Sequence, residues 1–265
     1  MIFYLKKIEE NNLLVAGQLM LDDMCVLEVH SETNKAFDFL QGQVTSDISS
    51  LSENSSYQLS SICNQKGQVV ADFIINRSGE AYKIIIKNEL VELFINDLEP
   101  YAKFFSVNFI KNKDYVHGYV VKTRLEESLL KNETFGLLVK CSRDKINNTL
   151  VKEDWVTSNL LLGNYNISSI DSGKFRPAEI MQDKTRISFN KGCFRGQEII
   201  ARMKYLGKEK TSMRLVISST ALKIENKKIT NLLSYQTQAM HVNVLLGNKN
   251  LVDALINSVA SIFVK

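Results

Sequence analysis

Residues with strong structural or chemical signatures are scarce in this chain of 265 residues, which has two prolines, one tryptophan and three histidines. The cysteines are far apart and form no CxxC pair, which excludes a zinc knuckle and a thioredoxin-like dithiol. The histidines are also scattered and there is no HExxH motif, so no metal site is predicted. No run approaches the roughly 20 apolar residues of a membrane-spanning helix, and residues 1–12 lack the apolar core of a signal peptide. We therefore expect a cytoplasmic protein that does not associate with membranes.

Positive charge is concentrated in one part of the chain. The net charge is +4, yet residues 174–210 contain ten Lys or Arg and only four Asp or Glu, which gives this window a charge of +6. A cationic segment suits an anionic ligand or an acidic partner surface, and a solvated charged face is the alternative. Few aromatic residues are interleaved with these charges, which argues against direct nucleic-acid binding.

The hydrophobic pattern predicts meandering strands interrupted by helices. Glu89–Phe105 has apolar residues at spacings of three and four, which indicates an amphipathic helix. Gly67, the fourth of five connecting residues, predicts a hairpin between Tyr57–Cys63 and Val69–Asn76. Further strands are predicted at Met20–Val29, Ala81–Lys87, Val116–Lys122, Phe135–Cys141, Met213–Ser218, Lys228–Tyr235 and Ala239–Leu246, and further helices at Asn34–Leu40, Arg124–Lys131, Arg143–Lys152, Gln197–Lys204 and Leu251–Phe263. Gly163–Asn190 has no clear period and is predicted to be a long ordered connection. This order of elements predicts an α+β fold of layered antiparallel sheets.

The segment Phe189–Arg202 carries the strongest chemical signal. Cys193 is flanked by two glycines and precedes a predicted helix, whose positive dipole end favours a thiolate. Lys191, Arg195 and Arg202 add positive charge that favours the thiolate further. These residues predict a nucleophilic thiol that reacts faster than the other three cysteines. A buried, inert cysteine is the alternative.

The same segment resembles a family signature. Residues 191–198, Lys-Gly-Cys-Phe-Arg-Gly-Gln-Glu, are similar to the K-G-C-[aromatic]-x-G-Q-E signature of the YgfZ family, which are folate-binding relatives of the glycine-cleavage T-protein (aminomethyltransferase). Arg202 falls where the family has a trailing arginine, and residues 171–177 resemble the family's S-G-x-F-x-P approach to the signature. Further blocks match in the same order, at residues 21–23, 41–47 and 66–68. The matches span residues 21–207.

The resemblance implies an aminomethyltransferase-like α+β fold with a folate-binding region over residues 1–208, made of two interleaved subdomains, and an abbreviated C-terminal β-barrel over residues 209–265. It implies a cytoplasmic accessory protein without conventional turnover that binds tetrahydrofolate and supports assembly or repair of iron–sulfur clusters. The implied partners are iron–sulfur proteins such as tRNA methylthiotransferases, through which the family affects tRNA modification. In bacteria the family is also linked to control of replication initiation. Cys193, with Lys191 and Arg202 near it, takes the place of the cysteine on which family activity chiefly depends.

Three residues are implied in the folate site. Trp155, the only tryptophan, corresponds to a family tryptophan that lines the site, and a core-packing role is the alternative. Met24 replaces a second family tryptophan and offers a weaker contact through its sulfur. Asp72 lies near the position of a T-protein aspartate that could steer protonation of a folate nitrogen, and a solvent-facing strand residue is the alternative. Leu161 replaces a glutamate that binds the pterin in many relatives, which predicts folate binding weaker by about 1–3 kcal/mol.

Three functions stay open on the sequence. The first is the folate-dependent accessory factor, with Cys193 as the working thiol at an opening shared with the pterin. The second is an aminomethyltransferase-type enzyme acting on a carrier-bound methylamine, against which the cysteine signature argues because the T-protein lacks it. The third is a scaffold that has kept the fold and lost the ligand, which Met24 and Leu161 support.

Overall fold

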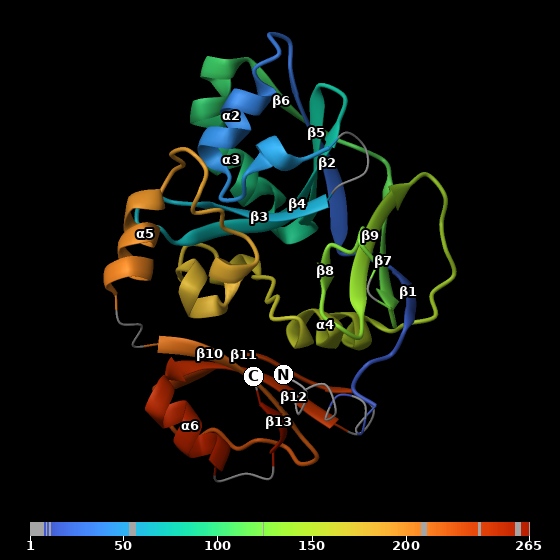
Figure 1. The fold of residues 1–265 in the computed structure, drawn as a ribbon, viewed down its shortest axis with the longest axis vertical. Helices are drawn as coiled ribbons and strands as arrows, with labels where there is room; N and C mark the ends of the chain where they lie inside the picture. The colour runs from blue at the N-terminus through green and yellow to red at the C-terminus, as the bar shows by residue number, and fades with distance from the viewer. Residues whose placement is uncertain are drawn as a thin grey trace.

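Three antiparallel sheets form the framework of the protein (Figure 1). The structure, a computed structural model, describes residues 8, 10, 12–52, 57–123, 125–207, 211–237 and 240–257, together with the backbone of residues 261–264. The central sheet has the strand order β3-β4-β5-β2-β6, the second sheet β1-β7-β9-β8, and the third sheet β11-β12-β10-β13. The strands are β1 (Gly17–Met20), β2 (Met24–Ser31), β3 (Tyr57–Cys63), β4 (Val69–Ser78), β5 (Ala81–Lys87), β6 (Val107–Lys111), β7 (Tyr115–Val121), β8 (Leu130–Lys131), β9 (Gly136–Ser142), β10 (Thr211–Ser218), β11 (Ile229–Thr237), β12 (Met240–Asn248) and β13 (Ser261–Val264). The α-helices are α2 (Ala36–Gln43), α3 (Val91–Ala102), α4 (Lys152–Leu161), α5 (Gln197–Leu206) and α6 (Lys249–Asn257).

The central sheet carries the main core. The first eight residues of β4 are all buried, so this strand is covered on both faces. On one face, Phe94 of α3 packs edge-on against Phe73 and Phe109, with ring centroids 5.2 and 5.8 Å apart. The amphipathic helix predicted at Glu89–Phe105 is confirmed as α3 with a short 3-10 turn at each end.

The helix predicted at Arg124–Lys131 is wrong. Arg124 lies outside the described residues, and residues 125–131 form no helix. Leu130–Lys131 instead form the short edge strand β8, paired with β9. The backbone N–H of Leu129 also donates to Leu137. Pairing with β9 and partial burial of Leu129 and Leu130 against the core outweigh the local helical spacing.

The helix predicted at Arg143–Lys152 is also wrong, because α4 begins only at Lys152. Residues 147–150 run along the edge of β1 and form no helix. Asn148 accepts from the backbone N–H of Met20 through its Oδ1 at 2.8 Å, and Thr149 accepts from that of Gln18 through its Oγ1 at 2.9 Å. Asn and Thr side chains compete for backbone groups in this way, and here they satisfy donors that an edge strand leaves open.

The third sheet does not confirm the expected C-terminal barrel. In the described part of the chain its edge strands, β11 and β13, are not paired with each other. Helix α6 packs on the sheet through Val252 and Ile256, which lie in a small apolar cluster with Val216 and Leu245. The helix predicted at Leu251–Phe263 ends early, since α6 stops at residue 257 and residues 261–264 pair with β10. None of the described helices is long and apolar enough to cross a membrane.

The connection at Gly163–Asn190 has a fixed path beside the central sheet. It contains three short 3-10 turns, at Ser169–Asp171, Pro177–Ile180 and Gln182–Lys184. Val69 of β4 exchanges backbone hydrogen bonds with this segment, donating to Phe175 and accepting from Gly173, each at 2.8 Å. The segment therefore brings its polar side chains to the same strand that carries Asp72.

Candidate functional site

A cavity of about 290 Å³ is lined by the central sheet, helix α4 and strand β11 of the third sheet. Strands β4 and β5, helix α4 and strand β11 all contribute to its walls. About half of the lining side chains are apolar, among them Leu21, Ile74, Val156, Leu160, Leu232 and Leu233, and the other half are polar or charged. Met24, Asp72 and Trp155, the three residues that the resemblance implies in a folate site, all line this one cavity. A cavity that combines apolar walls with convergent polar groups suits a small molecule that has both rings and hydrogen-bonding edges.

Trp155 belongs both to the core and to the cavity wall. Its side chain lies on α4 and is only 8% exposed. Gly118 of β7 allows this close approach, since a β-carbon there would lie 2.9 Å from Cζ3 of the indole ring. The Trp155 carbonyl also accepts a hydrogen bond of 2.9 Å from Nδ2 of Asn159. Trp155 can therefore both line a ligand site and pack in the core, the two roles that the sequence left open.

Leu161 does not face the cavity. It is 1% exposed and packs in the core, whereas Asn159 and Leu160 on the same helix line the cavity. The expected weakening of pterin binding by an apolar side chain at residue 161 therefore has no basis in this geometry. Met24, at the start of β2, is half-buried and does line the cavity.

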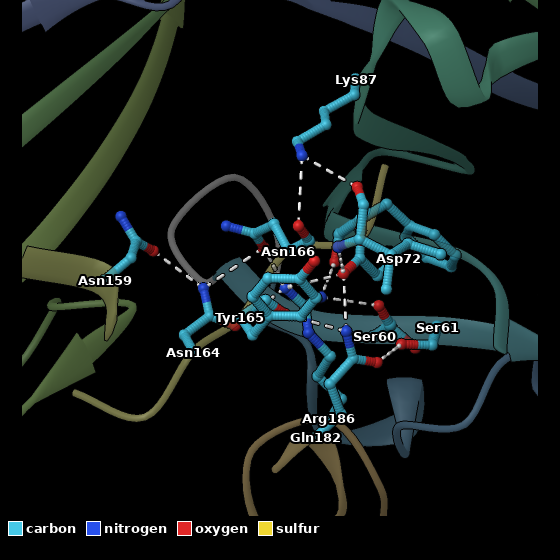
Figure 2. Close-up of polar contacts among 12 residues, drawn as sticks. Ser60, Ser61, Asp72, Lys87, Asn159, Asn164, Tyr165, Asn166, Gln182 and Arg186 are labelled. Carbon is cyan, nitrogen blue, oxygen red and sulfur yellow. Dashed lines mark hydrogen bonds and ion pairs between the residues drawn. The ribbon is translucent and has the colours of Figure 1, made fainter. Parts of the chain in front are cut away.

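Asp72 is a buried acid on β4, and the alternative of a solvent-facing residue is wrong (Figure 2). It is 3% exposed. Its Oδ2 accepts from Nε2 of Gln182 at 2.6 Å and from the backbone N–H of Ile167 at 2.9 Å. Gln182 is held in turn by Ser61, whose hydroxyl donates to its Oε1 at 3.0 Å. The carboxylate thus has a fixed position in the cavity wall.

Arg186 is the most buried of the cations that line this cavity (Figure 2). Its side chain is 1% exposed. Its Nη1 donates to the backbone carbonyls of Ser60 and Phe73 at 2.8 and 2.9 Å. Its Nη2 donates to Oδ1 of Asn164 and of Asn166 at 3.0 and 2.6 Å, and lies 3.9 Å from Oδ2 of Asp72. Burial lowers the pKa of Arg186, and the nearby carboxylate opposes that shift. The guanidinium therefore joins two strands of the central sheet to the loop that follows α4.

Sequence reasoning missed Arg186, Gln182 and Lys87 as parts of the site. Lys87 also lines the cavity, and its Nζ donates to the carbonyls of Asn166 and Ile167 at 3.2 and 2.8 Å. In the sequence, Arg186 contributed only one positive charge to the cationic segment at residues 174–210. The sequence alone does not distinguish a buried arginine from a solvent-exposed one. The only feature of the sequence that pointed to Arg186 and Gln182 was the segment Gly163–Asn190, which contains both residues and has no helical or strand periodicity.

The loop of Cys193 is built on two glycines that touch. Gly67, in the β3–β4 hairpin, has φ of +70°, as the turn position predicted. Gly196 has φ of +81° and immediately precedes α5, and a β-carbon there would lie 2.5 Å from the Asn64 carbonyl oxygen and 3.2 Å from Cα of Gly67. Two segments that matched the family separately thus form one packed unit, which fixes the start of α5.

The three cations expected around the thiol each have another partner. Lys191 is buried, and its Nζ donates to the carbonyls of Gln41, Val44 and Ser46 at 2.7, 2.7 and 2.9 Å. Arg195 pairs with Asp97 and lies over the ring of Tyr101, and Arg202 pairs with Glu198 one turn earlier on α5 at 3.4 Å. Lys191 therefore has a structural role in closing the end of α2.

Cys193 itself is exposed, so the alternative of a buried thiol is wrong. It is not among the residues that line the cavity, and the expected opening shared by thiol and pterin is absent from the described residues. The cavity and the thiol are two separate places on the chain.

We expect an alkylating reagent at pH 7 to modify Cys193 at least about tenfold faster than the other thiols. Cys25 and Cys63 are buried, and burial raises the pKa of Cys63 and Cys141 to about 12. Peptide mass spectrometry over time measures the four rates, with a Cys193→Ser chain as the control that loses the fast phase. Similar rates for Cys193 and Cys141 would contradict the expectation.

Lys191 gives a prediction for stability. Replacing it with methionine leaves three buried carbonyls without a donor but also removes a buried charge, so we expect the free energy of unfolding to fall by about 1–3 kcal/mol at pH 7. A Lys113→Met change at an exposed lysine is the matched control, and chemical denaturation measures both.

The same variant tests the pH dependence. Burial lowers the pKa of Lys191 to about 8, partly opposed by Asp47. Between about pH 8 and the ordinary value of 10.5, the unfolded chain holds a proton that the folded chain has lost, so this group makes stability rise with pH. The difference in unfolding free energy between the wild type and Lys191→Met should therefore grow from pH 7.5 to pH 10, at up to about 1.4 kcal/mol per pH unit. A constant difference over this range would show that the carbonyls hold the ammonium charged.

Named proteins from several bacteria are similar in sequence to this chain. No family model matches the chain. The protein named tRNA-modifying protein YgfZ from Shigella boydii is 26% identical over 241 residues, covering 77% of this chain and 72% of that protein. The protein of the same name from Vibrio atlanticus is 27% identical over 220 residues, covering 71% of this chain and 67% of its own length. These proteins are homologues of the chain.

The structural comparison concerns the fold alone. The crystal structure of the glycine cleavage system aminomethyltransferase T from Bartonella henselae superposes with a TM-score of 0.57. It covers 91% of this chain and 81% of its own chain, at 11% sequence identity. The fold is aminomethyltransferase-like. The mixed α+β architecture with antiparallel sheets that the sequence predicted is thereby confirmed, without the barrel.

Proposed function

We propose that this chain is a folate-binding accessory protein which supports the assembly or repair of iron–sulfur clusters and, through them, tRNA modification. The observation that carries the proposal is the convergence of Met24, Asp72 and Trp155 on one cavity of an aminomethyltransferase-like fold. The homologues named as tRNA-modifying proteins support the tRNA part of the role.

The cavity residues fit a reduced folate chemically. The indole of Trp155 and the surrounding apolar side chains suit a pterin or aminobenzoyl ring. Asp72 offers a buried carboxylate as acceptor for an N–H edge. The volume of about 290 Å³ is close to the lower end of ligand sites, about 300–1,000 Å³, which suits the ring system with the glutamate tail outside. A bound tetrahydrofolate would supply one-carbon chemistry, and the chain would hold its rings and keep water from them.

Under this proposal Cys193 acts on a partner protein and not on the folate. The thiol is exposed and lies outside the cavity, so a macromolecule can reach it. The tight packing of Gly196 on the β3–β4 hairpin holds its loop in place. Iron–sulfur proteins such as tRNA methylthiotransferases are the proposed partners. Lys191 supports this thiol by fixing the loop, and Arg202 contributes charge on the exposed face of α5.

Titration with tetrahydrofolate tests the binding part. Trp155 is the only tryptophan, so the fluorescence of the chain reports directly on the cavity. We expect a saturable change with a dissociation constant below about 100 μM. No change up to millimolar ligand would contradict folate binding and favour the scaffold without a ligand.

Genetic complementation tests the thiol. In a bacterial strain that lacks its YgfZ homologue, we expect the wild-type chain to restore methylthiolated tRNA, and a Cys193→Ala chain to fail. Cys141→Ala, at a half-buried thiol, is the matched control and should restore it. Full restoration by Cys193→Ala would remove Cys193 as the working group. Folate-dependent release of formaldehyde or methylamine by the purified chain would favour an aminomethyltransferase instead.

A further inference from the structure

Strand β11 meets the cavity through an irregular segment. Asn231 pairs with Leu245 and Leu233 pairs with Val244, so the register of β11 on β12 shifts around Leu232. Consecutive residues of a regular strand point to opposite faces of the sheet. Leu232 and Leu233 nevertheless both line the cavity. A β-bulge redirects side chains in this way, and bulges are frequent beside functional sites.

Two hydrogen bonds fix the bulged strand against α4. The hydroxyl groups of Thr157 and Tyr235 are 2.8 Å apart, and the hydroxyl of Thr237 donates to Oδ1 of Asp154 at 3.2 Å. Trp155 lies between the two helix residues in sequence and faces the cavity from the same helix. The position of the two leucines relative to the indole is therefore set by contacts outside the cavity.

We infer that Leu232 and Leu233 are ligand-binding residues of the site, forming an apolar wall from the third sheet against the ring system of a bound reduced pterin. This inference rests on the proposed function. Both leucines are half-buried and pack against the main core, so a ring beside them would remove their remaining apolar surface from water. Ligand binding then couples the third sheet to α4 and the central sheet.

Hydrogen–deuterium exchange on the full chain, with and without tetrahydrofolate, tests the inference. We expect slower exchange on binding in peptides from three places: residues 152–161, residues 69–78 and residues 229–237. Protection of the first two without the third would overturn the inference and leave folate binding intact. No protection in any of them, together with unchanged Trp155 fluorescence, would overturn both.

A pair of variants on β11 separates the wall from general stability. Leu232→Ala should weaken tetrahydrofolate binding about tenfold, because it removes apolar surface that the ligand would cover. Gln236→Ala, at an exposed position of the same strand, should leave the affinity within about twofold. Thermal unfolding shows whether each variant is folded at the assay temperature. Equal affinities for folded Leu232→Ala and the wild type would contradict the inference, as would equal losses in both variants.

Discussion

Replacing Arg186 with leucine is expected to lower the free energy of unfolding by about 3–5 kcal/mol. The guanidinium is buried and donates to two backbone carbonyls and two asparagine side chains, all of which would lose a donor. Asp72 would also lose the nearest buried cation, 3.9 Å away. Equilibrium denaturation in urea measures the change.

An exposed arginine is the control for this effect. Arg202→Leu removes a surface pair with Glu198 and should change stability by less than about 1 kcal/mol. If Arg186→Leu were as mild as Arg202→Leu, the polar network around Asp72 would not hold the cavity wall together.

Replacing Trp155 with alanine is expected to weaken tetrahydrofolate binding by about 2–3 kcal/mol, roughly 30- to 150-fold. The change removes the largest aromatic surface in the cavity wall. Isothermal titration calorimetry measures the affinity without relying on the tryptophan that is lost.

Leu161→Ala is the matched control for Trp155→Ala. Both residues are buried in α4, so both changes should destabilise the fold, but only Trp155 lines the cavity. We expect Leu161→Ala to keep the wild-type affinity within about threefold in the folded protein. An equal loss of affinity in both variants would mean that the effect comes from damage to the helix.

Local sequence patterns predicted the elements whose stability is largely local. The hairpin with Gly67 at its turn and the helix at Glu89–Phe105 follow from the geometry of a turn and from an apolar helical face. The resemblance, not the pattern, placed Met24, Asp72 and Trp155 together, because these residues are distant in sequence and share no period.

Other features depend on tertiary contacts that a single sequence does not display. Leu130–Lys131 form a strand because they pair with β9. Residues 147–150 form no helix because their side chains accept hydrogen bonds from the edge of β1. The burial of Lys191 and Arg186 has the same origin, since each is surrounded by acceptors from other segments. The separation of Cys193 from the cavity could not be predicted either, because a sequence motif does not show which cavity its side chains face.

The cavity and the Cys193 loop are two separate sites with different proposed roles. A folate held between α4, the central sheet and β11 would report on ligand availability, while the exposed thiol on the loop before α5 would contact a protein partner. Helix α4 connects to the central sheet through Asn159, Asn164 and Arg186, in a continuous chain of hydrogen bonds.

A crystal structure of the full chain grown with tetrahydrofolate tests the central claim most directly. We expect electron density for the pterin inside the cavity, with its rings in contact with Trp155 and an N–H edge within hydrogen-bond distance of Asp72. Density at another place on the chain, or an empty cavity at saturating ligand, would contradict it.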